Sequence, residues 1–279
     1  MTPMRFYGTP LPDADLRPYP GKLIVIEGTD GVGRSTHIAE LRTWLEAKGY
    51  AVADTGMTRS ELAGRGIKEA KTGHTLGKIT MQLFYATDFA DRLDNEIIPA
   101  LKAGFIVLTD RYMYSAIARA VVRGMDPDWV RDVYKISLVP DAIFYLRIDS
   151  ISDLVLRLLE TGKGFDYWES GMDVGFGEDF YDSFVSYQSQ LLEEFDRMTE
   201  EYGFKVIRAS RSIARVSADL RRAITAVIDS GAPESFASEK SGLGVPPIVN
   251  GSESEQTHTH PPVKPHPPVK RKKKVAQEL

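Results

Sequence analysis

The sequence contains no cysteine among its 279 residues, which excludes disulfide bonds, thiol nucleophiles, and zinc or iron–sulfur sites with thiolate ligands. Long apolar runs are missing too. The longest clean ones, such as Leu23–Ile26, have only a few residues, whereas a membrane-spanning helix needs about 20. No apolar stretch follows the charge near the N-terminus, so we expect no secretory signal. The sequence therefore predicts a soluble, cytoplasmic protein without a membrane partner.

The net charge of −4 hides an uneven distribution of residue types along the chain. Residues 230–279 hold half of the 16 prolines, and such a composition buries too little apolar surface to offset its ordering entropy, so we expect a disordered tail there. Residues 1–20 are also rich in proline, and we expect an irregular extension of the same kind. The remaining residues, 21–229, have a suitable size for one domain with its own core.

Short apolar segments alternate with amphipathic ones across this domain. They predict five strands that lie too far apart for hairpins, which favours crossover helices between them. Apolar residues at helical spacing predict two such helices, with Ile79 and Leu83 on the buried face of the first and Leu159 on that of the second. We therefore expect an α/β fold of three layers, with helices on both faces of a five-stranded parallel sheet. The predicted strands are 22–27, 50–54, 105–109, 142–148 and 204–208.

A glycine-rich segment follows the first predicted strand. Its glycines allow a tight turn with inward amide N–H groups, and the positive end of the next helix faces the same space, which suits a polyphosphate. Ser35 stands where a hydroxyl would hold Mg²⁺, and Asp30 could reach the waters of the metal or the incoming phosphate. Arg34 replaces the lysine of the strict motif and keeps its charge as a planar fork. The alternative is an ordinary strand-to-helix turn. The predicted ATP-binding residues are Gly28, Thr29, Asp30, Gly31, Val32, Gly33, Arg34, Ser35 and Thr36.

An acid followed by a cation ends the predicted strand 105–109. In a parallel sheet this pair emerges at the same edge as the glycine-rich segment, so Asp110 could approach Mg²⁺ and Arg111 a phosphate. The alternative is an ion pair that closes the end of the strand.

Together these residues resemble the thymidylate kinase family of P-loop nucleoside monophosphate kinases. The resemblance runs from about Lys22 to Asp229 and is carried by several blocks in the same order, which are 28–36, 83–88, 98–101, 110–112 with Ser115, and 140–141. It implies transfer of the γ-phosphoryl group of ATP to a nucleoside monophosphate with the help of Mg²⁺, in a homodimer. It also implies that Arg111 and Arg59 hold the acceptor phosphate and that Tyr85 stacks on the acceptor base.

The chain departs from the family pattern around the base. Where the family has a base-contacting arginine four residues after the stacking aromatic, this chain has Phe89, and where the family continues Ala-Tyr-Gln, residues 118–120 are Ala-Arg-Ala. Tyr85, Phe89 and Arg92 fall on one helical stripe, so Arg92 could contact a different base. The alternative is that the two aromatics are core residues and Arg92 is a solvated charge.

The segment 161–171 resembles the family's mobile lid but has no arginine, and Lys163 is its one cation. Loss of an arginine finger can slow phosphoryl transfer about 10³-fold, so we expect slow chemistry unless Arg34, Lys163 or Arg157 compensates. The catalytic candidates are Arg34, Asp30, Asp110 and Lys163. The leading hypothesis is a kinase acting on dTMP or a related monophosphate. A catalytically weak, kinase-derived nucleotide-binding protein is the alternative. The basic run at 270–274 favours a solubilising end over a nucleic-acid partner.

Overall fold

The computed structural model describes residues 3–10, 17–160, 162, 164–230 and 249–250. Its centre is a five-stranded sheet in which all strands are parallel, in the order β3 (Val52–Gly56), β4 (Ile106–Asp110), β2 (Lys22–Glu27), β5 (Ala142–Arg147) and β6 (Lys205–Arg208). Each strand lies within two residues of its predicted position. The fold class expected from the sequence is therefore confirmed.

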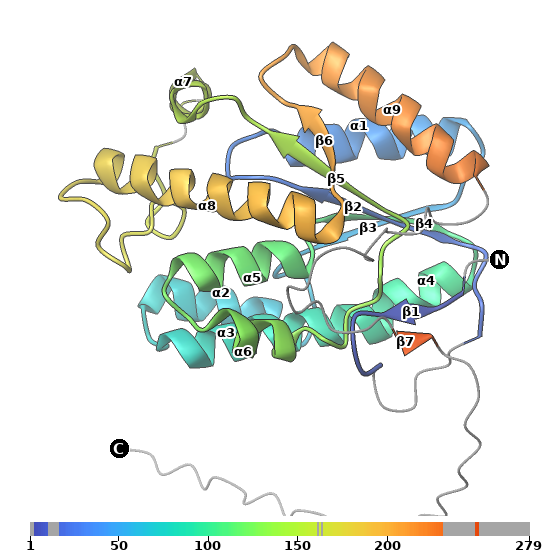
Figure 1. Ribbon diagram of the computed structural model, residues 1–279, viewed down its shortest axis with the longest axis horizontal. Helices are drawn as coiled ribbons and strands as arrows, with labels where there is room; N and C mark the ends of the chain where they lie inside the picture. The colour runs from blue at the N-terminus through green and yellow to red at the C-terminus, as the bar shows by residue number, and fades with distance from the viewer. Residues whose placement is uncertain (1–2, 11–16, 161, 163, 231–248, 251–279) are drawn as a thin grey trace, which may run out of the picture.

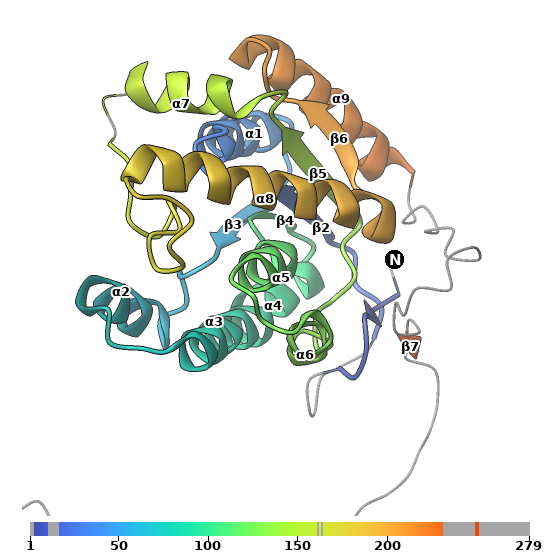
Figure 2. The same cartoon turned by 60° about the vertical axis from the view of Figure 1, so that its left-hand side comes forward.

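Helices cover both faces of the sheet (Figure 1). Successive side chains of β2 point to opposite faces of the sheet. Ile24 and Ile26 pack with α1 (Arg34–Ala47) and α9 (Ile213–Asp229) on one face. Leu23 and Val25 belong to the core on the other face. That opposite face is covered by α3 (Lys78–Arg92), the π-helix η1 (Leu93–Ile97), α4 (Ile98–Lys102), α5 (Met113–Val122) and α8 (Phe180–Tyr202). The structure also contains α2 (Gly64–Gly73), α6 (Pro127–Val133) and α7 (Ile151–Glu160), and α6 buries Val130 in the same core cluster as α5 and α8 (Figure 2). None of the helices described is both long and apolar enough to cross a membrane.

The buried face of α3 differs from the prediction. Ile79 and Leu83 are 62% and 46% exposed, while Met81, Gln82 and Phe89 point into the protein. The prediction assumed one α-helical period from 79 to 97 with Ile79 and Leu83 on the buried face. The buried stripe of α3 instead contains Met81, Gln82, Asp88, Phe89 and Arg92, and the chain continues from Leu93 as the π-helix η1. Leu159 on α7 is likewise exposed, because that helix buries a narrower stripe than expected.

The N-terminal extension also differs from the prediction. Although mostly irregular, it buries Phe6, Tyr7 and Tyr19 in the same core cluster as α5 and α8. The hydroxyl groups of Tyr7 and Tyr114 lie 2.8 Å apart. The short strand β1 (Arg5–Phe6) pairs with β7 (Val249–Asn250). The rest of the proline-rich tail lies outside the described residues, so its predicted disorder stays a prediction.

Candidate active site

The glycine-rich segment joins the end of β2 to the start of α1. Gly33 precedes the helix with a φ of 94°, a left-handed conformation that favours glycine. A Cβ on Gly28 would lie 2.8 Å from the carbonyl oxygen of Leu146 on neighbouring β5, so this position has no room for a side chain. The segment therefore holds the wide turn that phosphate binding requires at the carboxyl edge of the sheet.

Arg34 connects this turn to the end of β4. Its Nε donates to Asp110 Oδ1 at 2.8 Å, and an Nη donates to the carbonyl oxygen of Gly28 at 2.6 Å and to that of Thr29. Ser35 Oγ donates to the other carboxylate oxygen of Asp110 at 3.1 Å. Burial alone would raise the pKa of Asp110, but the charges of Arg34 and Arg111 outweigh it and lower this pKa, so Asp110 is an anion. The glycine-rich segment 28–36 and the pair Asp110–Arg111 thus lie in one cluster of hydrogen-bonded side chains.

Asp30 lies at the centre of a buried ion cluster. Arg119 donates to both carboxylate oxygens at 2.6 Å, Arg111 donates to one of them, and Gln188 Nε2 donates at 3.1 Å. Burial would raise the pKa of Asp30, but the charges of Arg119, Arg111 and Arg34 hold this pKa well below its usual range. The carboxylate is thus committed to protein cations, a different setting from the metal waters expected from the sequence.

Arg111 begins the loop after β4 in a strained conformation. Its φ is 68°, which is uncommon for a residue with a side chain, and its backbone N–H donates to the carbonyl oxygen of Ile26 at 3.0 Å. The fully buried Glu27 fixes the next turn by accepting from Tyr112 N at 2.8 Å and from Ser115 Oγ at 2.6 Å. The buried Nε of Arg111 has no hydrogen-bond partner among the described residues, which leaves a donor for an anionic ligand.

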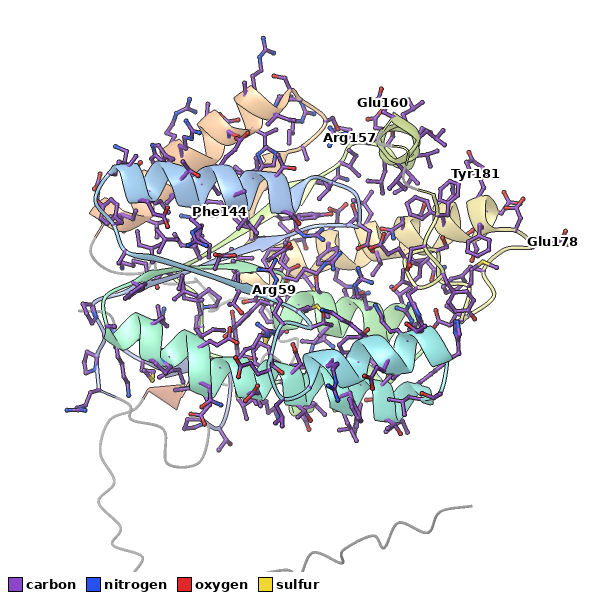
Figure 3. The ribbon with its side chains drawn as sticks, turned by 180° about the vertical axis from the view of Figure 1, so that it is seen from behind. Arg59, Phe144, Arg157, Glu160, Glu178 and Tyr181 are labelled. Carbon is purple, nitrogen blue, oxygen red and sulfur yellow. The ribbon has the colours of Figure 1, made fainter. Side chains whose placement is uncertain are left out.

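Two neighbouring cavities adjoin this cluster. One has a volume of about 620 Å³ and opens beside Arg34, Ser35 and Arg111, and its far wall carries Arg157 and Glu169. The other has a volume of about 180 Å³ and lies between α2, α3, α5 and the end of the lid-like segment. Figure 3 shows Arg59 near the middle of the molecule and Arg157 farther out, beside α7.

The smaller cavity contains only part of the predicted acceptor site. Tyr85 lines it, whereas Arg59 is not among its lining residues. One Nη of Arg59 lies 3.3 Å from Asp54 and the other 3.9 Å from Asp110. Phe89 instead packs edge-on against Tyr112 in the core, at 4.9 Å between ring centres. Arg92 is fully buried and donates to Asp88 at 3.0 Å, so it is neither a base contact nor a solvated charge. We therefore correct the expectation that Phe89 and Arg92 contact the acceptor base.

Several residues of the two cavities were missed by the sequence analysis. Arg119 and Gln188 hold Asp30, and Gln188 also donates to the carbonyl oxygen of Glu169 at 2.7 Å. Lys71 and Gln82 line the smaller cavity. The departure at residues 118–120 could have pointed to Arg119, but nothing local to Gln188 marks it, since its partner Asp30 lies 158 positions away.

The described end of the lid-like segment packs over α2. Trp168 stacks on His74 at 5.3 Å between ring centres, and its Nε1 donates to the carbonyl oxygen of Lys71 at 3.2 Å. Glu169 faces the larger cavity, and the negative charge of Asp30, followed by burial, raises its pKa. Lys163, predicted to be catalytic, lies outside the described residues.

In this parallel sheet β2 turns through a glycine-rich loop into a helix, and an acid–arginine pair ends the neighbouring strand β4. This arrangement defines a P-loop nucleotide-binding protein, here with a second cavity beside the loop. The family model for thymidylate kinase matches residues 26–220. The chain is 37% identical over 210 residues to the "Probable thymidylate kinase 2" of Saccharolobus solfataricus, which covers 75% of this chain and 98% of that protein. It is 32% identical over 219 residues to the "Thymidylate kinase" of Clavibacter michiganensis, covering 76% and 98%. The chain belongs to the thymidylate kinase family, and it is an ATP-dependent nucleoside monophosphate kinase.

Proposed function

We propose that this enzyme transfers the γ-phosphoryl group of ATP to the phosphate of dTMP, with ADP as the leaving group. The observation that carries the proposal is the joining of the glycine turn to the end of β4 through Arg34 and Asp110, directly beside a cavity lined by Tyr85. The donor phosphates would lie in the larger cavity and the acceptor base in the smaller one. Transfer then occurs between them, near Arg111.

The residues present fit a nucleotide with Mg²⁺. Ser35 Oγ and Asp110 supply two hard oxygen ligands 3.1 Å apart at the donor cavity. No group of three or more metal-binding side chains occurs among the described residues, but Mg²⁺ is usually bound through one or two protein ligands together with phosphates and waters. Ser35 and Asp110 would hold the metal, which would there supply positive charge against the phosphates.

In this proposal the enzyme accelerates phosphoryl transfer by neutralising phosphate charge and by positioning the two substrates. Residues 28–36 hold the donor phosphates with their amide groups and Arg34, while Arg111 and Arg59 hold the acceptor phosphate in line. Asp30 keeps the cations around it in place through its bonds to Arg111 and Arg119. Lys163 remains a proposed catalytic cation of the lid.

A coupled assay for ADP formation tests this function. Purified enzyme is supplied with ATP, Mg²⁺ and each common ribo- and deoxyribonucleoside monophosphate in turn. We expect dTMP to give the highest kcat/KM. Tight nucleotide binding without formation of any nucleoside diphosphate would contradict the proposal and favour the weak, nucleotide-binding alternative.

Lys71 gives the proposal a pH dependence. Burial, with help from the charge of Arg119, lowers the pKa of Lys71 to about 8, and its ammonium lies 6.0 Å from the ring centre of Trp168 at the acceptor cavity. An anionic acceptor raises the pKa of Lys71 on binding because it stabilises the ammonium. The affinity of the enzyme for the acceptor is therefore full below pH 8, where Lys71 is protonated, and falls as the pH rises above 8. We expect the KM for dTMP to rise from pH 8 to 9.5 in the native enzyme but not in Lys71→Met, while the KM for ATP stays level. An equal rise in both proteins would disprove this role.

We also propose that the enzyme works as a homodimer in the cytoplasm, where ATP is available. The exposed apolar side chains Ile79, Leu83 and Phe84 on α3 support a contact between two copies. Sedimentation velocity of the purified chain tests the dimer, and a monomer mass at micromolar concentration would rule it out.

A further inference from the structure

Two arginines share one carboxylate at the phosphate turn. Arg111 and Arg119 both donate to Asp30, and all three side chains are at most 20% exposed. Two further groups that interact electrostatically with Arg119, Lys71 and Glu169, have opposite charges and leave an excess of one positive charge. An excess charge that is largely shielded from water is costly, so the cluster favours an anionic ligand beside one of the two arginines.

Arg119 has N–H groups that no described residue engages. All of its hydrogen bonds leave from one nitrogen, Nη2, which donates to both carboxylate oxygens of Asp30 at 2.6 Å. Its Nε and its other Nη have no hydrogen bond within the described part of the chain, and 15% of the side chain is exposed. Every N–H group of a guanidinium is a donor, so these nitrogens can serve an anion however the group is turned.

The position of Arg119 is between the two cavities. Its side chain lines the smaller one, whereas its partner Asp30 and the neighbouring Arg111 line the larger one. Arg119 lies on α5, and the buried Glu27 fixes the start of that helix. A helix and a two-point ion pair therefore place this guanidinium, which is the rigid support that a catalytic group needs.

We propose that Arg119 contacts the transferring phosphoryl group, so that α5 supplies the arginine that the segment 161–171 does not have. This inference rests on the proposed function, which places phosphoryl transfer between the two cavities. An oxygen of the acceptor phosphate forms a bond to the γ-phosphorus while the bond from that phosphorus to the bridging oxygen of ATP breaks, and ADP keeps the electron pair. Arg119 keeps its protons throughout, and its N–H groups stabilise the negative charge on the transferring oxygens.

Arg119→Met tests this contact by steady-state and single-turnover kinetics. The kcat for phosphorylation of dTMP is expected to fall about 10- to 100-fold, the usual effect of losing a hydrogen bond to a charged group. The KM values for ATP and dTMP should stay close to native, because Arg111 and Gln188 still hold Asp30 in the variant. A native kcat in the folded variant, or a loss that lies wholly in KM, would overturn the proposal.

Arg131→Met is the matched control for the loss of a paired arginine. Arg131 also donates to a carboxylate through two nitrogens, at 3.1 and 3.0 Å from the oxygens of Glu201, and its side chain is 18% exposed. It lies on α6 and lines neither of the two cavities beside the phosphate turn. This variant should keep the native kcat.

A mimic of the transferring group distinguishes contact from a structural role. Calorimetry measures the binding of ADP and dTMP with Mg²⁺, in the presence and absence of aluminium fluoride, which takes the place of the phosphoryl group. Arg119→Met should lose the gain in affinity that aluminium fluoride gives the native enzyme, while the binding of ADP and dTMP alone stays native. Equal weakening of both complexes would show a structural role only and would overturn the proposal.

Arg119→Lys is the second variant, because it keeps a cation beside Asp30 should Arg119→Met fail to fold. A single ammonium cannot span the carboxylate and the phosphoryl group as a guanidinium does, so this variant should lose part of the same gain. An undiminished gain would overturn the proposal.

The same titrations separate this inference from the proposed function. If the native enzyme does not phosphorylate dTMP, but aluminium fluoride strengthens its binding of ADP only when Arg119 is present, the assignment of dTMP falls and the contact stands. Turnover of dTMP that does not depend on Arg119 has the opposite meaning.

Discussion

Arg34→Met is expected to lower kcat for phosphoryl transfer by about 10³-fold, the largest single loss that we predict. In the native enzyme the guanidinium joins Asp110 to the carbonyl oxygens of the phosphate turn, so its removal takes away a cation and loosens the turn at once. The measurement is a single-turnover assay with saturating ATP, Mg²⁺ and dTMP.

The controls separate charge from geometry. Arg34→Lys keeps the positive charge but loses the planar guanidinium. Its kcat should lie between that of the native enzyme and that of Arg34→Met. Arg42→Met removes a half-exposed arginine from the same helix and should keep native activity. Denaturant unfolding shows whether each variant is folded. A folded Arg34→Met enzyme with native kcat would refute the role of this residue.

Arg111→Ala is expected to raise the KM for dTMP about 100-fold and that for ATP far less, because the loss of one buried charge-assisted hydrogen bond has about this effect on affinity. Arg111 lines the larger cavity, and its buried Nε has no hydrogen-bond partner among the described residues. Arg119 and Gln188 still hold Asp30 in the variant, so the donor turn should keep its shape. Steady-state kinetics with each substrate varied in turn gives the two KM values.

Arg65→Ala is the matched control, since this arginine is largely exposed on α2 and its ion pair within the described part of the chain is with Glu69 in the same helix. It should leave both KM values unchanged. If Arg111→Ala raises the two KM values equally, Arg111 is not the acceptor-phosphate residue.

The sheet could be predicted from the sequence because its strands are buried on both faces. Continuous apolar segments such as 22–27 and 142–147 stand out against amphipathic surroundings, and their ends place Asp110 and the glycine turn at one edge. The phosphate turn was recognisable for the same reason, since its spacing is local. Each of these features depends on residues close together in the chain.

Features that the spacing of apolar residues does not encode were missed or misassigned. Arg92 has the right spacing to face a ligand, but the carboxylate of Asp88 inside the same helix draws it into the core. Phe6 and Tyr19 lie among prolines without any period, so their burial against α5 and α8 left no trace in the local pattern. Gln82 lies on the buried stripe of α3 together with Met81 and Phe89, a stripe that the spacing of the apolar residues did not reveal.

Titration of the native protein with ATP by isothermal calorimetry, in the presence and absence of Mg²⁺, tests the central claim most directly. The claim is that residues 28–36, with Arg34 in place of lysine, bind the phosphates of one ATP molecule per chain. We expect one site per chain, with affinity that depends on Mg²⁺ and is sharply reduced in Arg34→Met. Absence of any magnesium-dependent binding of ATP would contradict the account.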